Sequence, residues 1–419
     1  MDKREWKYSD EYIKVLDGIR AIAILIIVWY HFWQQSWLQP IKEVEFLSVF
    51  HCNPINFDWL VRTGFEMVDM MLLLSGFCLF LPYARSMVYG VEEPSVKKFY
   101  KKRVARIVPS YLIAIVIAVI VAVANGEYAS NEEMWGDLIP HLFFGHNFFE
   151  QSYIRTKLNG VLWTLAVEVQ FYLIFPLVAK LFKRWMCQTY VAMVAISWVF
   201  INWGILDRVP VEKHSMWINQ LPTFLGVYAN GMLAAFAVVK LTQIFNQFLD
   251  GKEVTERKKE KSQIGYFFTL LLIICLFVYY KLMNELAYIE DKNTWQITNR
   301  FEVSVVYAVF IVACVFAVPK MQKVFGNKVT KFLSGISFQI YIWHQYLALL
   351  LKNNRIPYWE GDEAPNVTGD QVWIRKYFIL CWVCVFIVAI VATYLLERPC
   401  AKWIMKRKTP SEKDSAAIQ

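Results

Sequence analysis

Charged side chains are scarce in this sequence of 419 residues. Asp, Glu, Lys and Arg make up only 19% of it, whereas 57% is hydrophobic and 17% is aromatic. Soluble globular proteins carry about 25% charged residues, which cover their surface. The scarcity of charge therefore excludes a chain built from soluble domains. It favours a single membrane-embedded domain over 1–419, with an N-terminal segment 1–15, a transmembrane core 16–396 and a tail 397–419.

Cysteine is also sparse and irregularly placed. Of the eight cysteines, most fall within or beside apolar runs, and only Cys52 lies clearly in a loop. Thiols at such positions are packing residues, and their spacing matches neither a disulfide framework nor a zinc motif. We therefore expect no structural disulfide and no bound metal.

The first residues lack the features of a cleavable signal peptide. The opening stretch, MDKREWKYSDEY, is too polar for a signal-peptide core, and no cleavage-like site follows the first apolar run. We expect 16–33 to remain in the protein as its first span.

Long apolar runs recur along the whole chain. Runs of about 20 such residues are typical of membrane-spanning helices. The sequence therefore predicts an all-α, polytopic membrane protein with about ten transmembrane helices. The spans are expected at 16–33, 60–82, 107–124, 161–181, 187–206, 218–239, 264–283, 300–318, 334–352 and 373–396.

Lys and Arg are concentrated in alternate loops. With the N-terminus in the cytoplasm, every loop expected inside carries more Lys and Arg than its outer neighbours, so both termini are predicted to be cytoplasmic. The formal net charge of +9 is then explained by basic loops beside anionic lipid headgroups. The bilayer is the expected partner, and a nucleic acid is not required.

Two loops differ from the rest. The inner segment 250–261 (DGKEVTERKKEK) is expected to be a solvated linker of mixed charge. The outer segment 131–149 is apolar but interrupted by Pro140 and Gly145. We expect it either to lie along the outer interface or to enter the protein as a re-entrant segment.

The first span carries ionisable groups at both ends. In LDGIRAIAILIIVWYH (16–31), eleven residues separate Arg20 from His31, which places both on one helix face, about 16 Å apart along the axis. Asp17, three residues before Arg20, lies on the same face and can pair with it. Snorkelling of Arg20 to the headgroups and an interfacial position for His31 are the alternatives. The shared face favours a polar cavity.

Other spans add ionisable groups to the outer half of the membrane. Glu66 and Asp69 lie one turn apart in the second span, and Glu168 lies about two turns into the fourth, close to Trp163. His344 lies near the middle of the ninth span. Such groups either join helices structurally or mark a functional site. The functional alternative is favoured for Glu168.

The third span begins with a basic cluster. Residues 97–111 (KKFYKKRVARIVPSY) place Arg103 and Arg106 on one helix face at the membrane entry. Guanidinium pairs bind phosphates with two parallel hydrogen bonds. The positive-inside rule explains the four lysines of the cluster better than it explains these two arginines.

Together these groups indicate a two-sided site. Phosphates of a cytoplasmic ligand are expected at the arginines, and an imidazole with carboxylates lies near the outer face. Acyl-CoA has a phosphorylated head and a long thin arm that suit this separation. His31 is then a candidate general base for an acceptor hydroxyl, with a neighbouring carboxylate that fixes its tautomer. Transient acylation of His31 is the other route.

These residues fall in motifs that resemble those of the acyltransferase-3 family of membrane acyltransferases. The first-span segment 16–31 resembles the family's L-D-G-x-R-A-x-A-I-L…H. Other matches are VDMMLLLSGF (68–77), RVARIVPSY (103–111), HLFFGHN (141–147), LWTLAVEVQFYL (162–173), SFQIYIWH (337–344) and YLLERP (394–399). Met71 and Leu72 replace phenylalanines of the family pattern, and Val169 replaces a frequent glutamate.

The resemblance implies a multi-pass enzyme of the bacterial cytoplasmic membrane that moves an acyl group, commonly acetyl, from acyl-CoA to a hydroxyl. The position of His31 in the family pattern implies that this histidine is catalytic. Glu168 and Asp69 are further catalytic candidates. The resemblance associates Arg20, Arg103 and Arg106 with the donor. We add Asp17 as a candidate donor-binding residue, and the candidates for binding the acceptor are Glu66, Trp163, His344, Tyr341 and Asn147. The family includes members with an added hydrolase-like domain, and this sequence is expected to represent the stand-alone form.

The acceptor is not specified by the sequence. A surface glycan is favoured because the outer loops are rich in aromatic residues, although membrane interfaces enrich the same residues. A transporter or flippase of a small polar or lipid-linked substrate is the alternative function, since buried charges and broken segments also mark permeation pathways.

Overall fold

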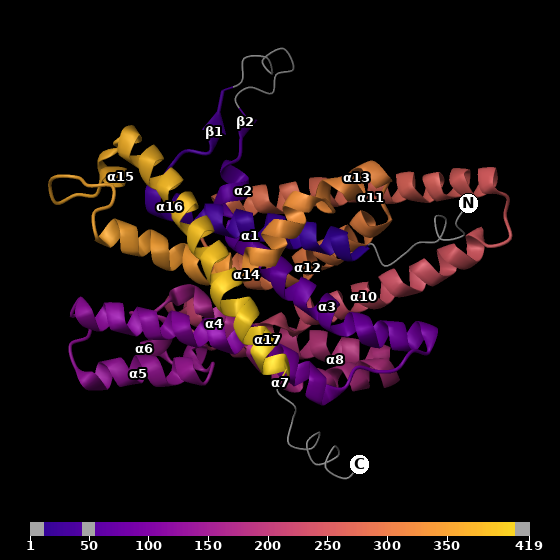
Figure 1. The fold of residues 1–419 in the computed structure, drawn as a ribbon, viewed down its shortest axis with the longest axis horizontal. Helices are drawn as coiled ribbons and strands as arrows, with labels where there is room; N and C mark the ends of the chain where they lie inside the picture. The colour runs from indigo at the N-terminus through magenta and orange to yellow at the C-terminus, as the bar shows by residue number, and fades with distance from the viewer. Residues whose placement is uncertain (1–11, 44–54, 407–419) are drawn as a thin grey trace, which may run out of the picture.

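The computed structural model describes residues 12–43 and 55–406. Helices make up most of this part of the chain, and the only strands within it form a short antiparallel hairpin, β1 (Ile41–Lys42) with β2 (Ile55–Asn56). Figure 1 shows the long helices side by side in one bundle, from which the hairpin projects. The predicted all-α class is confirmed. Cys52 lies outside the described residues.

Nine helical segments of the described chain are long and apolar enough to cross a membrane. Six of the ten predicted spans fall within these segments, and three others, 60–82, 218–239 and 300–318, overlap them and extend beyond one end by two to four residues. The nine observed segments correspond to α1 (Tyr12–Ser36), α3 (Met67–Tyr89), α4 (Val96–Ala124), α7 (Trp163–Arg184), α8 (Met186–Val199) with the π-helix η5 (Phe200–Leu206), α10 (Leu221–Leu249), α11 (Val254–Tyr288), α12 (Lys292–Phe316), and α16 (Gln371–Ala392) with η7 (Thr393–Glu397) and α17 (Arg398–Lys406).

The remaining predicted span, 334–352, lies in α14 (Lys328–Asn353), a helix of 26 residues whose apolar stretch is less hydrophobic than those of the nine segments. Ser334 donates a hydrogen bond to Asp17 near the start of α1 (2.9 Å), and Lys352 donates one to the carbonyl of Gln35 near its end (2.9 Å). The two helices therefore run parallel along their whole length. Because α14 is buried beside α1, it tolerates polar residues that a lipid-facing helix would expose.

The prediction that 250–261 is a linker is wrong for most of these residues, because α11 begins at Val254 and residues 254–261 are helical. Glu and Lys are good helix formers. Lys252 also lies 3.3 Å from Glu256 and 3.5 Å from Glu260, and such pairs support the first turns of a helix. The helix thus begins well before the apolar run that it carries.

Short helices connect the long ones. These are α2 (Asp58–Arg62), η2 (Gly64–Glu66), α5 (Asn131–Leu142), η3 (His146–Phe148), α6 (Glu150–Tyr153), η4 (Gly160–Leu162), η6 (Val211–Lys213), α9 (His214–Trp217), α13 (Pro319–Phe325) and α15 (Pro365–Thr368). The segment expected to be interfacial or re-entrant forms α5 and the turn after it. Tyr111 of α4 donates a hydrogen bond to the carbonyl of His141 (2.7 Å) and holds this segment against the bundle.

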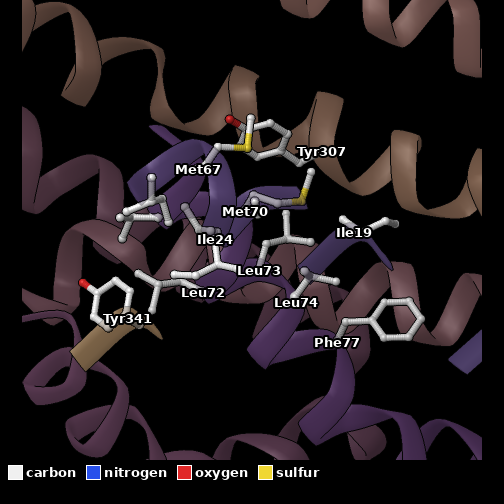
Figure 2. Packing of buried hydrophobic residues seen from close by; sticks show 14 of the residues in the cluster. Ile19, Ile24, Met67, Met70, Leu72, Leu73, Leu74, Phe77, Tyr307 and Tyr341 are labelled. Atoms are coloured by element: carbon white, nitrogen blue, oxygen red, sulfur yellow. The ribbon is translucent and has the colours of Figure 1, made fainter. Parts of the chain in front are cut away.

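The core is centred on α3. A side chain at Gly231 of α10 would come within 2.2 Å of the carbonyl oxygen of Leu73, so only glycine permits the close contact between these two helices. Figure 2 shows the two faces of α3: Met67 lies toward Tyr307 of α12, whereas Leu72 lies toward Tyr341 of α14. The Leu72 face contributes to the cavity described next.

The start of α1 and the end of the last span lie at the same end of α14. Asp17 is bonded to Ser334 of α14, and Glu397 accepts a hydrogen bond from Gln339 of the same helix (2.9 Å). This is the arrangement expected if both termini are on one side of the membrane. That this side is the cytoplasm stays a prediction.

Candidate active site

A cavity of about 140 Å³ lies between five helices, α1, α3, α4, α7 and α14. Its polar lining includes Arg20, Ser75, Arg103, Arg106, Glu168 and Tyr341. Of the residues predicted to hold the donor, three arginines from two helices meet here. The positions of Arg20 on α1, and of Arg103 and Arg106 three residues apart on α4, follow from helix periodicity.

The arginines form a cationic end of the cavity. Arg20 lies 3.7 Å from Asp17 and donates a weak hydrogen bond to the sulfur of Cys78 (3.6 Å). The guanidinium of Arg103 lies 5.3 Å from the ring centre of Tyr172, and its buried Nε has no hydrogen-bond partner among the described residues. Because a buried donor is normally hydrogen-bonded, this nitrogen is available to an anionic ligand.

Glu168 of α7 extends into the same cavity. Its Oε1 accepts hydrogen bonds from the hydroxyl of Ser75 (2.8 Å) and from the hydroxyl of Tyr172. Glu168 therefore lines the cavity, and the functional role favoured for it stays a prediction. Ser75 and Tyr172 were missed as members of the site, although both lie in motifs that the sequence presents.

His31 lies one turn beyond Ile27, which among the residues of α1 that line the cavity is the one nearest the C-terminal end of the helix. Its Nδ1 is 3.0 Å from Oε1 of Gln34, and the amide nitrogen of Gln34 donates to the hydroxyl of Tyr30 (2.8 Å). The amide oxygen of Gln34 therefore faces the imidazole, which assigns the proton to Nδ1 and leaves Nε2 with a free lone pair. The partner expected for His31 was a carboxylate. That expectation is wrong, because a glutamine at i+3 fills the position.

A second imidazole stands beside the first. The ring centres of His31 and His344 are 4.9 Å apart. His344 is completely buried and donates from Nδ1 to the carbonyl of Tyr341 (2.7 Å). The Tyr341 hydroxyl is fixed in turn by Thr164 (2.7 Å) and by the carbonyl of Val161 (2.9 Å). Since Tyr341 lines the cavity, the rings of Tyr341, His344 and His31 connect its far end to the first-span imidazole.

Asp69 and Glu66 are not among the residues that line this cavity. Asp69 accepts a hydrogen bond from Nε of Arg300 (2.9 Å), and both side chains are almost completely buried. Arg300 also donates to the carbonyl of Ile218 (2.8 Å) and to the hydroxyl of Thr223 (2.9 Å). The sequence signal for Arg300, an arginine at the start of an apolar span, was overlooked. The catalytic role predicted for Asp69 has no support from its position.

Asn147 and Trp163 also lie outside the cavity lining. The side-chain amide of Asn147 accepts from Gln170 (3.0 Å) and donates to the carbonyl of Asn219 (3.1 Å), so it joins the loop after α5 to α7 and to the segment before α10. The ring of Trp163 lies 6.0 Å from that of Phe224. Contact of either residue with an acceptor stays a prediction.

A second pair of histidines lies in the segment between α4 and α7. The rings of His141 and His146 stack with centres 4.0 Å apart. Burial lowers the pKa of both imidazoles, and for His141 the neighbouring Asp137 opposes this shift in part. Both are therefore neutral at pH 7. Within the described residues, no three metal-binding side chains come together.

Comparison with known proteins adds independent information. The profile of a family described as "Acyltransferase domain" matches residues 13–398. Among curated proteins, the chain is 23% identical over 414 residues to the peptidoglycan O-acetyltransferase OatA of Listeria monocytogenes, an alignment that covers 96% of this chain and 57% of the relative. It is 24% identical over 362 residues to the O-acetyltransferase OatA of Staphylococcus aureus, covering 82% and 53%.

The chain therefore spans about half the length of these relatives. No solved structure matches it at a significant level.

Proposed function

Because this chain belongs to the acyltransferase-3 family and is a multi-pass integral membrane protein, we propose that it is an acyl-CoA-dependent O-acyltransferase. It moves an acyl group, acetyl in the first instance, to a hydroxyl of an extracytoplasmic glycan. The observation that carries the proposal is the cavity with three arginines at one end and a connected pair of imidazoles beyond the other.

The donor occupies the cavity with its head at the cationic end. Arg20, Arg103 and Arg106 hold the phosphates of CoA, and Asp17 orients Arg20 through their 3.7 Å contact. The thin pantetheine arm passes Glu168 toward Tyr341. A half-buried carboxylate that already accepts two hydroxyl hydrogen bonds is suited to accept another from an amide of that arm.

The acyl transfer then proceeds at the far end of the cavity. Nε2 of His31 takes the proton of the acceptor hydroxyl, whose oxygen forms a bond with the thioester carbonyl carbon. The carbon–sulfur bond breaks, its electron pair leaves with the sulfur, and the thiolate takes up a proton to give CoA. Gln34 holds the imidazole in the tautomer that this step requires. Transient acylation of His31 is the alternative route to the same products.

The class of acceptor is proposed from the chemistry of the reaction and from the names of the relatives. One relative is named a peptidoglycan O-acetyltransferase, so fragments of peptidoglycan are the first acceptors to test. Contact of the acceptor with Glu66, Trp163 and Asn147 is also part of the proposal. Asp69 is proposed to act indirectly, by holding α3 against α12 through Arg300.

The decisive experiment uses purified protein in detergent with radiolabelled acetyl-CoA and soluble peptidoglycan fragments. Label is expected in the fragments with the wild type and not with His31→Ala. His214→Asn is the control, since His214 is a buried histidine in the short helix α9, outside the cavity. If the protein is a transporter or flippase, the fragments stay unlabelled with the wild type and with every variant. That result would refute the proposal.

A further inference from the structure

The two imidazoles beyond the cavity have complementary unpaired nitrogens. We propose that His344 shares the proton that His31 removes from the acceptor, so that the positive charge of the reaction is spread over both rings. This rests on the proposed function, because it concerns the same transfer step. It assigns His344 a proton-sharing role instead of the acceptor contact expected from the sequence.

His344 has one nitrogen engaged and one free. Its Nδ1 donates to the Tyr341 carbonyl one turn earlier in α14, so its Nε2 carries a lone pair. This Nε2 is buried and has no hydrogen-bond partner among the described residues. Buried polar atoms are normally paired, and each exception calls for an explanation.

His31 presents the matching atom. The contact with Gln34 assigns its proton to Nδ1, which leaves its Nε2 as the basic nitrogen. The ring centres lie 4.9 Å apart, and each ring nitrogen lies about 1 Å from its ring centre, so an N–H···N hydrogen bond of about 2.9 Å can form when the two Nε2 atoms turn toward each other around a proton. Before a proton arrives, Nε2 of His344 is buried without a hydrogen-bond partner among the described residues.

The reaction supplies that proton. The hydroxyl O–H bond breaks and the proton goes to Nε2 of His31, while the hydroxyl oxygen forms the ester bond. The proton is then held between the two Nε2 atoms. When the carbon–sulfur bond has broken, the thiolate sulfur takes the proton, and both imidazoles return to their neutral forms. An isolated imidazolium is costly in a buried site, and a shared proton lowers that cost.

The parallel packing of α1 and α14 keeps the two rings in register. Asp17 with Ser334 and Gln35 with Lys352 fix the helices below and above the imidazoles. A slip by one helical turn, about 5.4 Å, would separate the rings.

The test compares His344→Asn with the wild type. The amide nitrogen of asparagine takes the place of Nδ1 and can still donate to the Tyr341 carbonyl, but nothing replaces Nε2. If His344 only positions α14, this variant should retain the wild-type rate. Proton sharing predicts instead that kcat falls at least about tenfold, because acid–base groups typically contribute 10²–10⁴ in rate, while KM for acyl-CoA stays unchanged.

A second readout separates proton sharing from a subtle change of shape. Rates measured in mixtures of H₂O and D₂O should give a curved plot for the wild type, with more than one proton in motion, and a straight plot for His344→Asn. A variant with the wild-type rate, or a slower variant with an equally curved plot, would overturn the proposal. Should His344→Asn not fold, His344→Gln is measured in the same way, since its amide fills the place of Nε2 without accepting a proton at neutral pH.

The outcomes also separate this inference from the proposed function. If the wild type moves no acyl group from acyl-CoA, the proposed function fails. If the wild type is active and the His344 variants match it, only the sharing of the proton fails.

Discussion

Replacement of Asp69 by asparagine should destabilise the protein without abolishing its chemistry. Asp69 and Arg300 are 1% and 2% exposed and are joined by a 2.9 Å hydrogen bond. Asparagine has nearly the shape of aspartate but removes the charge that compensates the guanidinium. Loss of one partner of a buried ion pair costs about 3–5 kcal/mol, because the other charge stays buried and uncompensated.

Other contacts of Arg300 reduce the expected loss of stability. Arg300 would keep two further acceptors, the carbonyl of Ile218 and the hydroxyl of Thr223, and its guanidinium lies 4.1 Å from the ring centre of Phe224. These contacts satisfy one nitrogen and shield the charge in part, so the lower end of the range, about 3 kcal/mol, is expected for Asp69→Asn. The double variant Asp69→Asn/Arg300→Met should recover part of that loss, since no unpaired charge is left.

The assay is reversible unfolding in mixed micelles with increasing denaturing detergent, followed by acyl transfer per folded molecule. Asp69→Asn should unfold at a lower detergent fraction, and the folded fraction should transfer acyl groups at close to the wild-type rate. A variant as stable as the wild type but inactive would refute this reasoning and return Asp69 to the catalytic role expected from the sequence.

Three further predictions concern the site and its surroundings. Arg106→Gln should raise KM for acyl-CoA about tenfold in steady-state kinetics, since a hydrogen bond to a charged group contributes about 1.5–3 kcal/mol, whereas Arg155→Gln, an exposed control, should leave KM unchanged. Gln34→Leu should lower kcat about fivefold at saturating donor, because His31 loses the hydrogen bond that fixes its tautomer; an unchanged kcat would contradict the assignment. The melting temperature should fall as pH drops below about 6.5, because burial lowers the pKa of His141 and His146 and the unfolded chain then binds more protons than the folded one. His146→Phe should show a smaller fall, and an equal fall would count against the pair.

The spans were predictable because hydropathy and length act locally. A helix such as α16 exposes a long apolar surface to lipid, and its composition alone reveals it. The hydropathy of α14 is weaker because its environment is protein, yet its apolar run was still long enough to be found. The helical start of α11 was missed, since charged residues that pair at i and i+4 form a helix without any apolar signal.

The site was predictable where one helix determines the geometry. Arg20 and His31 share a helix face, as do Arg103 and Arg106, and the structure brings the three arginines together with Glu168. Pairings between helices were not predictable in this way. Asp69 and Arg300 are 231 residues apart in sequence, and nothing in the local pattern of either span specifies the other as its partner.

The parallel packing of α1 and α14 explains why the two imidazoles come from two different helices. A rigid helix fixes the separation of Arg20 and His31 at about 16 Å, because each residue advances the axis by 1.5 Å. The second imidazole comes from α14, which lies in register with α1 and places His344 beside His31. Burial of α14 at this point keeps His344 away from water. The polar character that weakens the membrane signal of α14 is thus a consequence of its place in the site, because a helix that supplies a buried histidine and fixes the register of α1 must carry polar groups on the face that meets it.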